Sequence, residues 1–574
     1  MLVQSVLINP STRSFEGIGD DKEAIAWLDR EATKAFSQFI SLRASRNDRV
    51  IACRIPDELK IEIAKAAQCL THGDKDSEQP FTHHWLRLSQ ICSRWRETLN
   101  GTPLLWTSIL ANNVDRALAF LQRSQGLPLN IYLSRRLPEN DQKAFLDLVN
   151  LQACRVKSLN LCLSNTDLFE ITPSLNAALP LLERLCLKVP TKAGYPRSYP
   201  PRSLVFQPKR SCDPPLHTLI LDSVALSWDL PILKDLRVLE LIRSRDARSD
   251  FHESGLRFSH LMSILESCPL LEKLRIVTLG SPSYSLNPRK SEGIRIVRLP
   301  KLKQLEIQNA PEVLALLLSN LRIPTSAKVL LKPSMFNGRG PEPDYVTPFP
   351  SSLISNIPAV SQTAKVFLTS NWDDRNIILR AGPIHAQITK PDDWPIVVEF
   401  ILPCTVPIDD IKALALSGIN EDIARIFGPS VREIVIEGSH SGCDRRPTWP
   451  GLFAGLPQLQ ALSLKFFERN PYRCMSDDFE ASHVIDALNS DILPGGGGTV
   501  CPGLKEVRIT GDALCGCSVQ EIYYQLRDRA SFLGKLEILQ LAQCACSVPQ
   551  SNGVIWTDVA EQVDWEIRPM PVDC

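Results

Sequence analysis

A short apolar motif recurs ten times in the part of the chain that follows residue 150. Its order is apolar, two variable residues, apolar, one variable residue, apolar, as in Leu236-Arg-Val-Leu239-Glu-Leu241. The closing alternation is typical of a β-strand, in which successive side chains point to opposite faces. The copies begin at Val156, Leu182, Leu216, Leu236, Leu271, Leu302, Val431, Leu459, Leu504 and Leu536. Each copy therefore predicts a strand that buries one face.

Helical periodicity lies between several of these strands, at residues 256–265, 311–321 and 484–488. This alternation resembles a degenerate leucine-rich repeat, in which no single repeat buries its own apolar side. We therefore expect residues 151–574 to form an irregular α/β solenoid of parallel strands and helices that binds a partner. A set of ordinary α/β domains with apolar parallel strands is the alternative.

The repeat pattern is uneven along this half of the chain. Copies lie roughly 20 to 45 residues apart, where regular repeats hold to about 20–29. The Asn or Cys that usually comes after the motif is found at Cys544 but is mostly absent. Between about 335 and 425 the motif fades, and the pattern gives no position for two apparent strands at 363–368 and 396–402. We expect long loops and an interruption there.

The variable residue inside each predicted strand should point to the concave face of the solenoid. That face is the candidate substrate-binding surface, and its mixture of charged and apolar residues predicts no ligand class. These positions are Asn160, Cys186, Ile220, Glu240, Arg275, Glu306, Ser463 and Arg508.

The first 150 residues are mainly helical in pattern. Residues 21–49 predict a charged helix, which either packs on the next helices of the chain or forms a short coiled coil. Pro56 favours a helix start, and Asp57 and Glu58 stand near the positive end of that helix dipole. Residues 111–150 predict a connecting helix and a first strand.

Three segments in this region, in this order, resemble the F-box. They are Ile55-Pro56-Asp57-Glu58-Leu59, then Leu88 to Arg96, then Pro103-Leu104-Leu105-Trp106. Together with a helix before them and the segments 117–124 and 127–131 after them, they are similar to a version common in mushroom-forming fungi. Two departures are Ile55, where Leu is usual, and a long interval at 69–84. A long loop there has a small entropic cost. An ordinary helical bundle with two core tryptophans is the alternative.

The resemblance implies an N-terminal helical segment at 1–50, an F-box at 51–110 and a substrate-recognition role in an SCF-type E3 ubiquitin ligase. The F-box would bind the SKP adaptor and, through it, a cullin-RING ligase, and the repeat domain would bind an unknown protein. A non-catalytic repeat scaffold whose F-box no longer binds the adaptor is the alternative function. The positions carried over as adaptor-binding or F-box core are Pro56, Leu59, Ile63, Leu88, Ile91, Trp95 and Trp106.

Composition adds mainly exclusions. The chain has 574 residues, with 64 Lys+Arg and 64 Asp+Glu, so nothing overall favours binding to nucleic acid or an anionic membrane. Neither a secretory signal nor an apolar run of membrane-spanning length is seen, so we expect a cytoplasmic or nuclear protein. The 17 cysteines should then be free thiols, with Cys162, Cys186 and Cys268 in core positions.

Motifs for catalysis or metal binding are weak. Cys515 and Cys517, and Cys544 and Cys546, are too closely spaced for usual zinc ligands, and His83-His84 should be an exposed helix start. The glycines at 495–498 lack the Lys-Ser or Lys-Thr that comes next in a phosphate-binding loop. We therefore expect no catalytic residue, no metal and no cofactor. An enzyme with a Cys–His pair in a cleft is the remaining alternative.

Overall fold

The computed structural model places two compact units, Met1–Phe145 and Leu146–Cys574, which are described separately. The residues that the structure describes are 21–69, 83–111, 113–133, 138–164, 167–168, 171, 179–189, 216–224, 233–243, 258–278, 295–333, 347–350, 352–371, 376–384, 393–401, 408–438, 449–466, 480–489, 500–511, 516–544 and 555–568.

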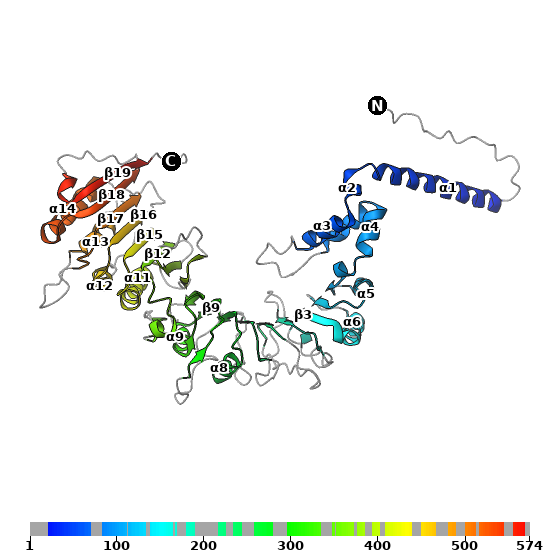
Figure 1. Ribbon diagram of the computed structural model, residues 1–574, viewed down its shortest axis with the longest axis horizontal. Helices are drawn as coiled ribbons and strands as arrows, with labels where there is room; N and C mark the ends of the chain where they lie inside the picture. Colours follow the sequence, from blue (N-terminus) through cyan, green and yellow to red (C-terminus); the bar gives the residue numbers. More distant parts are fainter. Residues whose placement is uncertain are drawn as a thin grey trace, which may run out of the picture. The chain divides into compact units, whose positions relative to one another are not determined.

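The first unit is mainly helical (Figure 1). Its elements are α1 (Asp21–Asn47), α2 (Ile51–Arg54), α3 (Asp57–Cys69), η2 (His84–Gln90), α4 (Ser93–Asn100), η3 (Pro103–Trp106), β1 (Ser108–Leu110), α5 (Val114–Arg123) and β2 (Leu129–Leu133). The long predicted helix is α1, and the predicted first strand is β2. Strand β1, which the sequence did not indicate, pairs in parallel with β2.

Local sequence explains where several of these helices begin. Helix α3 starts directly after Pro56, with two acidic residues in its first turn. At α5 the side chain of Asn113 accepts a hydrogen bond from the backbone N–H of Arg116 at 2.9 Å, as an N-cap residue does. Helix α3 packs against η2 and α4, so the first unit has a helical centre.

The second unit is a mixed α/β structure around a large, mostly parallel sheet. Its strands in this sheet are β3 (Val156–Cys162), β4 (Arg184–Lys188), β5 (Thr218–Asp222), β6 (Val238–Arg243), β7 (Lys273–Thr278), β9 (Gln304–Asn309), β11 (Lys328–Pro333), β12 (Lys365–Asn371), β13 (Asn376–Gly382), β14 (Ile396–Ile401), β15 (Glu433–Gly438), β16 (Ala461–Phe466), β17 (Glu506–Gly511), β18 (Leu536–Cys544) and β19 (Ala560–Arg568). A separate parallel pair is formed by β8 (Val297–Arg298) and β10 (Leu321–Arg322).

All ten motif copies overlap a strand, and the strands align their apolar positions. Leu159 pairs with Leu185, and the same row continues through Leu219, Leu239 and Leu274. These five side chains are at most 1% exposed. Because a shift by one residue would turn every side chain to the other face, the motif specifies this register.

The region where the motif fades holds a change in strand order. Strand β11 pairs with β14 rather than with β12, and β13 lies antiparallel between β14 and β12. Strand β12 then pairs in parallel with β15, after which the simple order resumes. The two strands without a predicted position are therefore β12 and β14, and β13 was not predicted.

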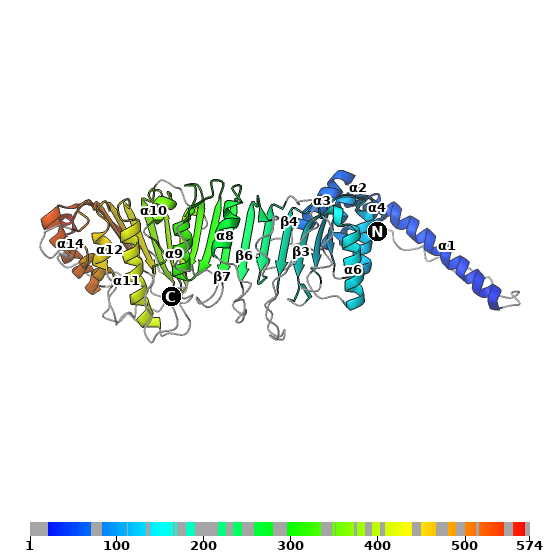
Figure 2. The ribbon, with the colours of Figure 1, turned by 90° about the horizontal axis from the view of Figure 1, so that it is seen from below.

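The helices of this unit lie on one face of the sheet (Figures 1 and 2). They are α6 (Glu139–Leu151, which begins in the first unit), α8 (Phe258–Glu266), α9 (Pro311–Asn320), α10 (Leu353–Asn356), α11 (Ile408–Ile426), α12 (Trp449–Ala454), α13 (Glu480–Asp486) and α14 (Gly516–Leu533), with short 3-10 turns η4 (Ala153–Arg155) and η10 (Trp556–Asp558). Helices α8, α9 and α13 confirm the three predicted helical segments.

The contact near α11 and α12 requires glycine. A Cβ atom on Gly428 would lie 2.0 Å from the Gly455 carbonyl oxygen, and one on Gly455 would lie 2.3 Å from the Ala424 Cβ. Both distances are far below van der Waals contact, so these positions accept no side chain. Among the described helices, none is long and apolar enough to cross a bilayer.

Candidate functional site

Aromatic side chains form the centre of the first unit. The Trp95 indole N–H donates to the Ala52 carbonyl oxygen at 2.8 Å and ties α4 to α2. The Trp106 indole N–H donates to the Leu99 carbonyl oxygen at 2.9 Å. Trp106 also lies edge-on to Trp85 and Phe120, with ring centroids 5.0 and 4.8 Å away. Both hydrogen-bonded tryptophans are at most 3% exposed.

The predicted adaptor-binding residues therefore divide into two groups. Trp95 and Trp106 lie in the core of the unit, which is one of the two roles expected for them, and they offer almost no exposed surface to a partner. Leu59, Ile63 and Ile91 are 54%, 40% and 42% exposed. The exposed group also includes Pro56, and Leu88 is half-buried.

A buried cation stabilises the start of α3. Lys60 is fully buried, and its Nζ lies 2.7 Å from Asp57 Oδ1. Thr98 on α4 also donates a hydrogen bond to that oxygen, at 3.1 Å. The hydrogen bonds from Lys60 and Thr98 lower the pKa of the Asp57 carboxyl. The Thr98 hydrogen bond thus links the first turn of α3, which carries Leu59, to α4.

The second candidate surface is the face of the sheet that no described helix covers, here called the open face. Its central row contains every predicted concave-face position. It is extended by Val435 and Gln540, from two further motif copies, and by the strands that the motif missed. In register the row is Asn160, Cys186, Ile220, Glu240, Arg275, Glu306, Leu330, Val397, Arg380, Phe367, Val435, Ser463, Arg508, Gln540 and Asp564.

Charges on β6, β7 and β9 form a chain of ion pairs across the open face. Glu240 Oε1 lies 2.7 Å from Lys273 Nζ, and its Oε2 lies 3.7 Å from Arg275. Arg275 in turn lies 3.0 Å from Glu306. Glu240 is 8% exposed, so its charge needs these partners.

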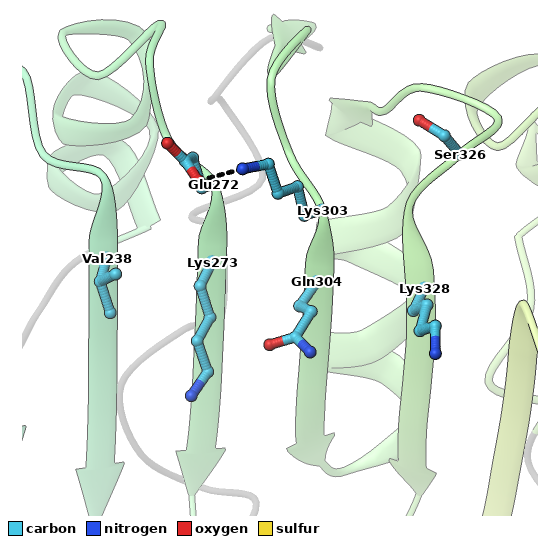
Figure 3. A pocket seen from close by; sticks show the side chains of 7 residues that line it. All are labelled: Val238, Glu272, Lys273, Lys303, Gln304, Ser326 and Lys328. Atoms are coloured by element: carbon cyan, nitrogen blue, oxygen red, sulfur yellow. Dashed lines mark hydrogen bonds and ion pairs between the residues drawn. The ribbon is translucent and has the colours of Figure 1, made fainter. Parts of the chain in front are cut away.

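A pocket of about 390 Å³ opens beside this chain of ion pairs (Figure 3). The floor of the pocket is one row of residues in register on four neighbouring strands: Val238, Lys273, Gln304 and Lys328. Glu272, Lys303 and Ser326 complete the lining above the strands. The three lysines each have a carboxylate partner: Glu240 at 2.7 Å, Glu272 at 2.5 Å and Asp393 at 3.3 Å. The charge of each lysine in the lining is thus matched by a carboxylate.

Another part of the open face lies where the strand order changes. Phe367 on β12 has the Arg380 guanidinium carbon and the Lys465 Nζ each 5.7 Å from its ring centroid, within the range of cation–π attraction. Trp394 lies 6.3 Å from the same ring, between centroids. Leu330 and Val397 continue the row toward β11. Sequence reasoning missed this cluster, because Phe367 belongs to no motif copy.

Several residues considered for chemistry have structural roles. Cys162, Cys186 and Cys268 are buried, as predicted. Burial raises the pKa of the Cys186 thiol to about 11, and that of the Cys501 thiol to about 12. Such thiols are not ionised near neutral pH and are poor nucleophiles.

The histidine and metal predictions have mixed outcomes. His83 is half-buried against Phe120 and its Nε2 lies 3.3 Å from the Ser108 carbonyl oxygen, which corrects the expectation of an exposed residue. Burial lowers the pKa of His83. The side chains of the two cysteine pairs and the glycine run lie outside the described residues. Within the described residues, no group of three or more His, Cys, Asp or Glu side chains is placed to hold a metal ion.

A scan of protein-family models gives no match to this chain, and no curated protein matches it either. The two surfaces, one on the first unit and one on the sheet, therefore have to be interpreted from their own residues.

Proposed function

We propose that the chain is the substrate-recognition subunit of an SCF-type ubiquitin ligase. In this proposal the first unit is an F-box that binds the SKP adaptor, and the second unit is a degenerate leucine-rich-repeat solenoid that binds a target protein. The observation that carries the proposal is the division of the motif residues: the two tryptophans are buried, while Leu59, Ile63 and Ile91 are exposed.

This division is what a docking unit requires. Leu59 and Ile63 are four residues apart on α3 and so lie on one face of that helix. A partner that covers exposed aliphatic side chains removes their apolar surface from water, which favours binding by about 25 cal/mol for each Å² buried. The buried tryptophans and the Lys60–Asp57 pair hold the helix that presents them.

The open face supports the second half of the proposal. It offers parallel rows of side chains from many strands, so that a protein partner can contact several strands at once. Its character changes along the sheet, from the ion pairs of Glu240 and Arg275 to the apolar and cationic surroundings of Phe367. In the ligase the chain would contribute no catalytic group and would act by raising the local concentration of its target near the charged E2 enzyme.

A pull-down of the full chain with purified SKP adaptor tests this function. The test variant carries Leu59→Ala and Ile63→Ala. The control carries Leu151→Ala and Leu181→Ala, which removes two exposed leucines, 75% and 43% exposed, from other parts of the chain. We expect the adaptor to bind the wild type and the control, and to bind the test variant at least about tenfold more weakly. A folded wild-type chain that retains no adaptor would leave the repeat scaffold as the better account.

A further inference from the structure

Helix α1 exposes an unusual amount of apolar surface. None of its described side chains is buried. The large apolar side chains that it exposes are Ile25, Trp27, Leu28, Phe36, Phe39, Ile40 and Leu42, each at least 37% exposed. Exposed apolar surface of this extent marks an interaction site.

The apolar residues of α1 follow a heptad pattern. Ile25, Leu28, Ala32, Ala35, Phe39 and Leu42 are spaced alternately by three and four residues. This is the spacing of the contact positions in a two-helix coiled coil. Phe36 extends the same stripe on one side. The stripe runs along most of the helix and is therefore suited to another helix of similar length.

Charge along α1 is divided between its two halves. Residues 21–33 contain four carboxylates, Asp21, Glu23, Asp29 and Glu31, against two cations, Lys22 and Arg30. Residues 34–47 contain three cations, Lys34, Arg43 and Arg46, and no carboxylate. Two parallel copies of this helix would align like charges, whereas two antiparallel copies would align opposite ones.

We propose that α1 pairs in antiparallel orientation with the α1 helix of a second copy of this chain. One register satisfies both patterns. It sets Ile25 opposite the partner's Leu42, Leu28 opposite the partner's Phe39, and Ala32 opposite the partner's Ala35. The small alanines at the centre allow close approach of the two helices, and the large side chains fill the space toward each end.

The same register also pairs the helix ends. Asp21 comes opposite the partner's Arg46, one such pair at each end of the interface. It brings Lys22 near the partner's Arg43, which is a repulsion. The pairing is thus specific enough to predict both a substitution that weakens the dimer and one that strengthens it.

The first experiment measures the mass of the full chain by sedimentation over about a hundredfold range of protein concentration. The test variant carries Leu28→Glu and Phe39→Glu. The matched control carries Ser37→Glu and Ala44→Glu, which add the same two charges on the opposite side of α1. We expect the wild type and the control to dimerise as concentration rises. The test variant should have a dimer Kd at least about 100-fold higher, because two symmetry-related contacts are lost.

A second variant tests the orientation. Lys22→Glu replaces the repulsion from the partner's Arg43 by an attraction, and we expect it to lower the dimer Kd several-fold at low salt, with less effect at high salt. In a parallel pair this substitution would add a further carboxylate between two acidic halves and weaken the dimer. Because no α1 side chain is buried in the fold, the thermal unfolding of the second unit should be unchanged in all variants.

Three results would overturn the proposal. The wild-type chain could remain monomeric across the whole range, which would assign the stripe to a different partner. The Leu28→Glu, Phe39→Glu variant could dimerise as well as the wild type, which would place the interface elsewhere. The Lys22→Glu variant could dimerise more weakly, which would contradict the antiparallel orientation.

Discussion

Trp95 and Trp85 should respond differently to replacement by phenylalanine, although both are buried in the first unit at 2% exposure or less. The Trp95 indole N–H is hydrogen-bonded to the Ala52 carbonyl oxygen. The Trp85 indole nitrogen is buried without a hydrogen-bond partner in the described part of the chain. The substitution removes similar apolar volume at both sites but removes a satisfied donor at one and an unsatisfied donor at the other.

The magnitudes can be worked from these contacts. Lost packing should cost about 1–2 kcal/mol at either site. Trp95→Phe also loses a hydrogen bond, which adds about 0.5–1.5 kcal/mol. Trp85→Phe instead removes a buried unpaired donor, whose cost of about 1–3 kcal/mol is recovered. We therefore expect Trp95→Phe to destabilise the first unit by about 2–3 kcal/mol and Trp85→Phe to change its stability little.

Hydrogen exchange of the amides in α3 and α4, measured on the full chain, reports the free energy of opening of this unit. The difference between the two variants is the quantity of interest, since it cancels the shared loss of packing. Equal destabilisation by both substitutions would refute the assignment of the two indole N–H groups.

Three further substitutions or conditions test the second unit. Arg529 is 6% exposed and donates hydrogen bonds to the carbonyl oxygens of Leu488, Val500 and Cys501. Arg529→Met should therefore lower the free energy of urea unfolding by about 3–5 kcal/mol. A loss below about 1 kcal/mol would show that these hydrogen bonds do not stabilise the unit. Gly428→Ala should lower the unfolding temperature sharply, because its Cβ would lie 2.2 Å from the Ala424 carbonyl oxygen, whereas Gly451→Ala meets no atom within 4 Å and should be harmless. The thiols of Cys186 and Cys501 have pKa values raised from 9.0 to about 11 and about 12. The stability that the neutral thiols contribute is therefore complete below pH 9 and decreases as pH rises through 9 toward 11. The urea unfolding midpoints at about pH 8 and about pH 10.5 should differ less in a Cys186→Ala, Cys501→Ala variant than in the wild type.

The sequence predicted the strands that carry the motif, because alternation of apolar residues is a local signal. It also predicted β12 and β14 as strands but could not place them, since the exchange in strand order depends on pairings between distant segments. Strand β13 was missed, although Ile377, Leu379 and Ala381 alternate with other residues and are buried. The motif has an apolar residue and two variable residues before its alternating part, and the antiparallel strand β13 does not have that beginning.

The candidate sites were predicted less completely than the fold. Motif order identified Leu59, Ile63 and Trp95 together, but a pattern of residue types does not separate exposed side chains from core side chains. The lysines of the pocket floor stand two residues before the outward positions, as Lys273 does before Arg275, and the period of two could have indicated them. Phe367 could not have been identified as part of a surface, because Arg380 and Lys465 reach it from strands placed by the altered order.

The affinity of the SKP adaptor for the full chain tests the central claim most directly. Titration calorimetry should give saturable one-to-one binding with a negative heat-capacity change, as expected when Leu59, Ile63 and Ile91 leave water. The Leu59→Ala, Ile63→Ala variant should bind at least about tenfold more weakly, while the Leu151→Ala, Leu181→Ala control binds as the wild type does. A folded wild-type chain that shows no binding, or an affinity unaffected by loss of the two α3 side chains, would contradict the account.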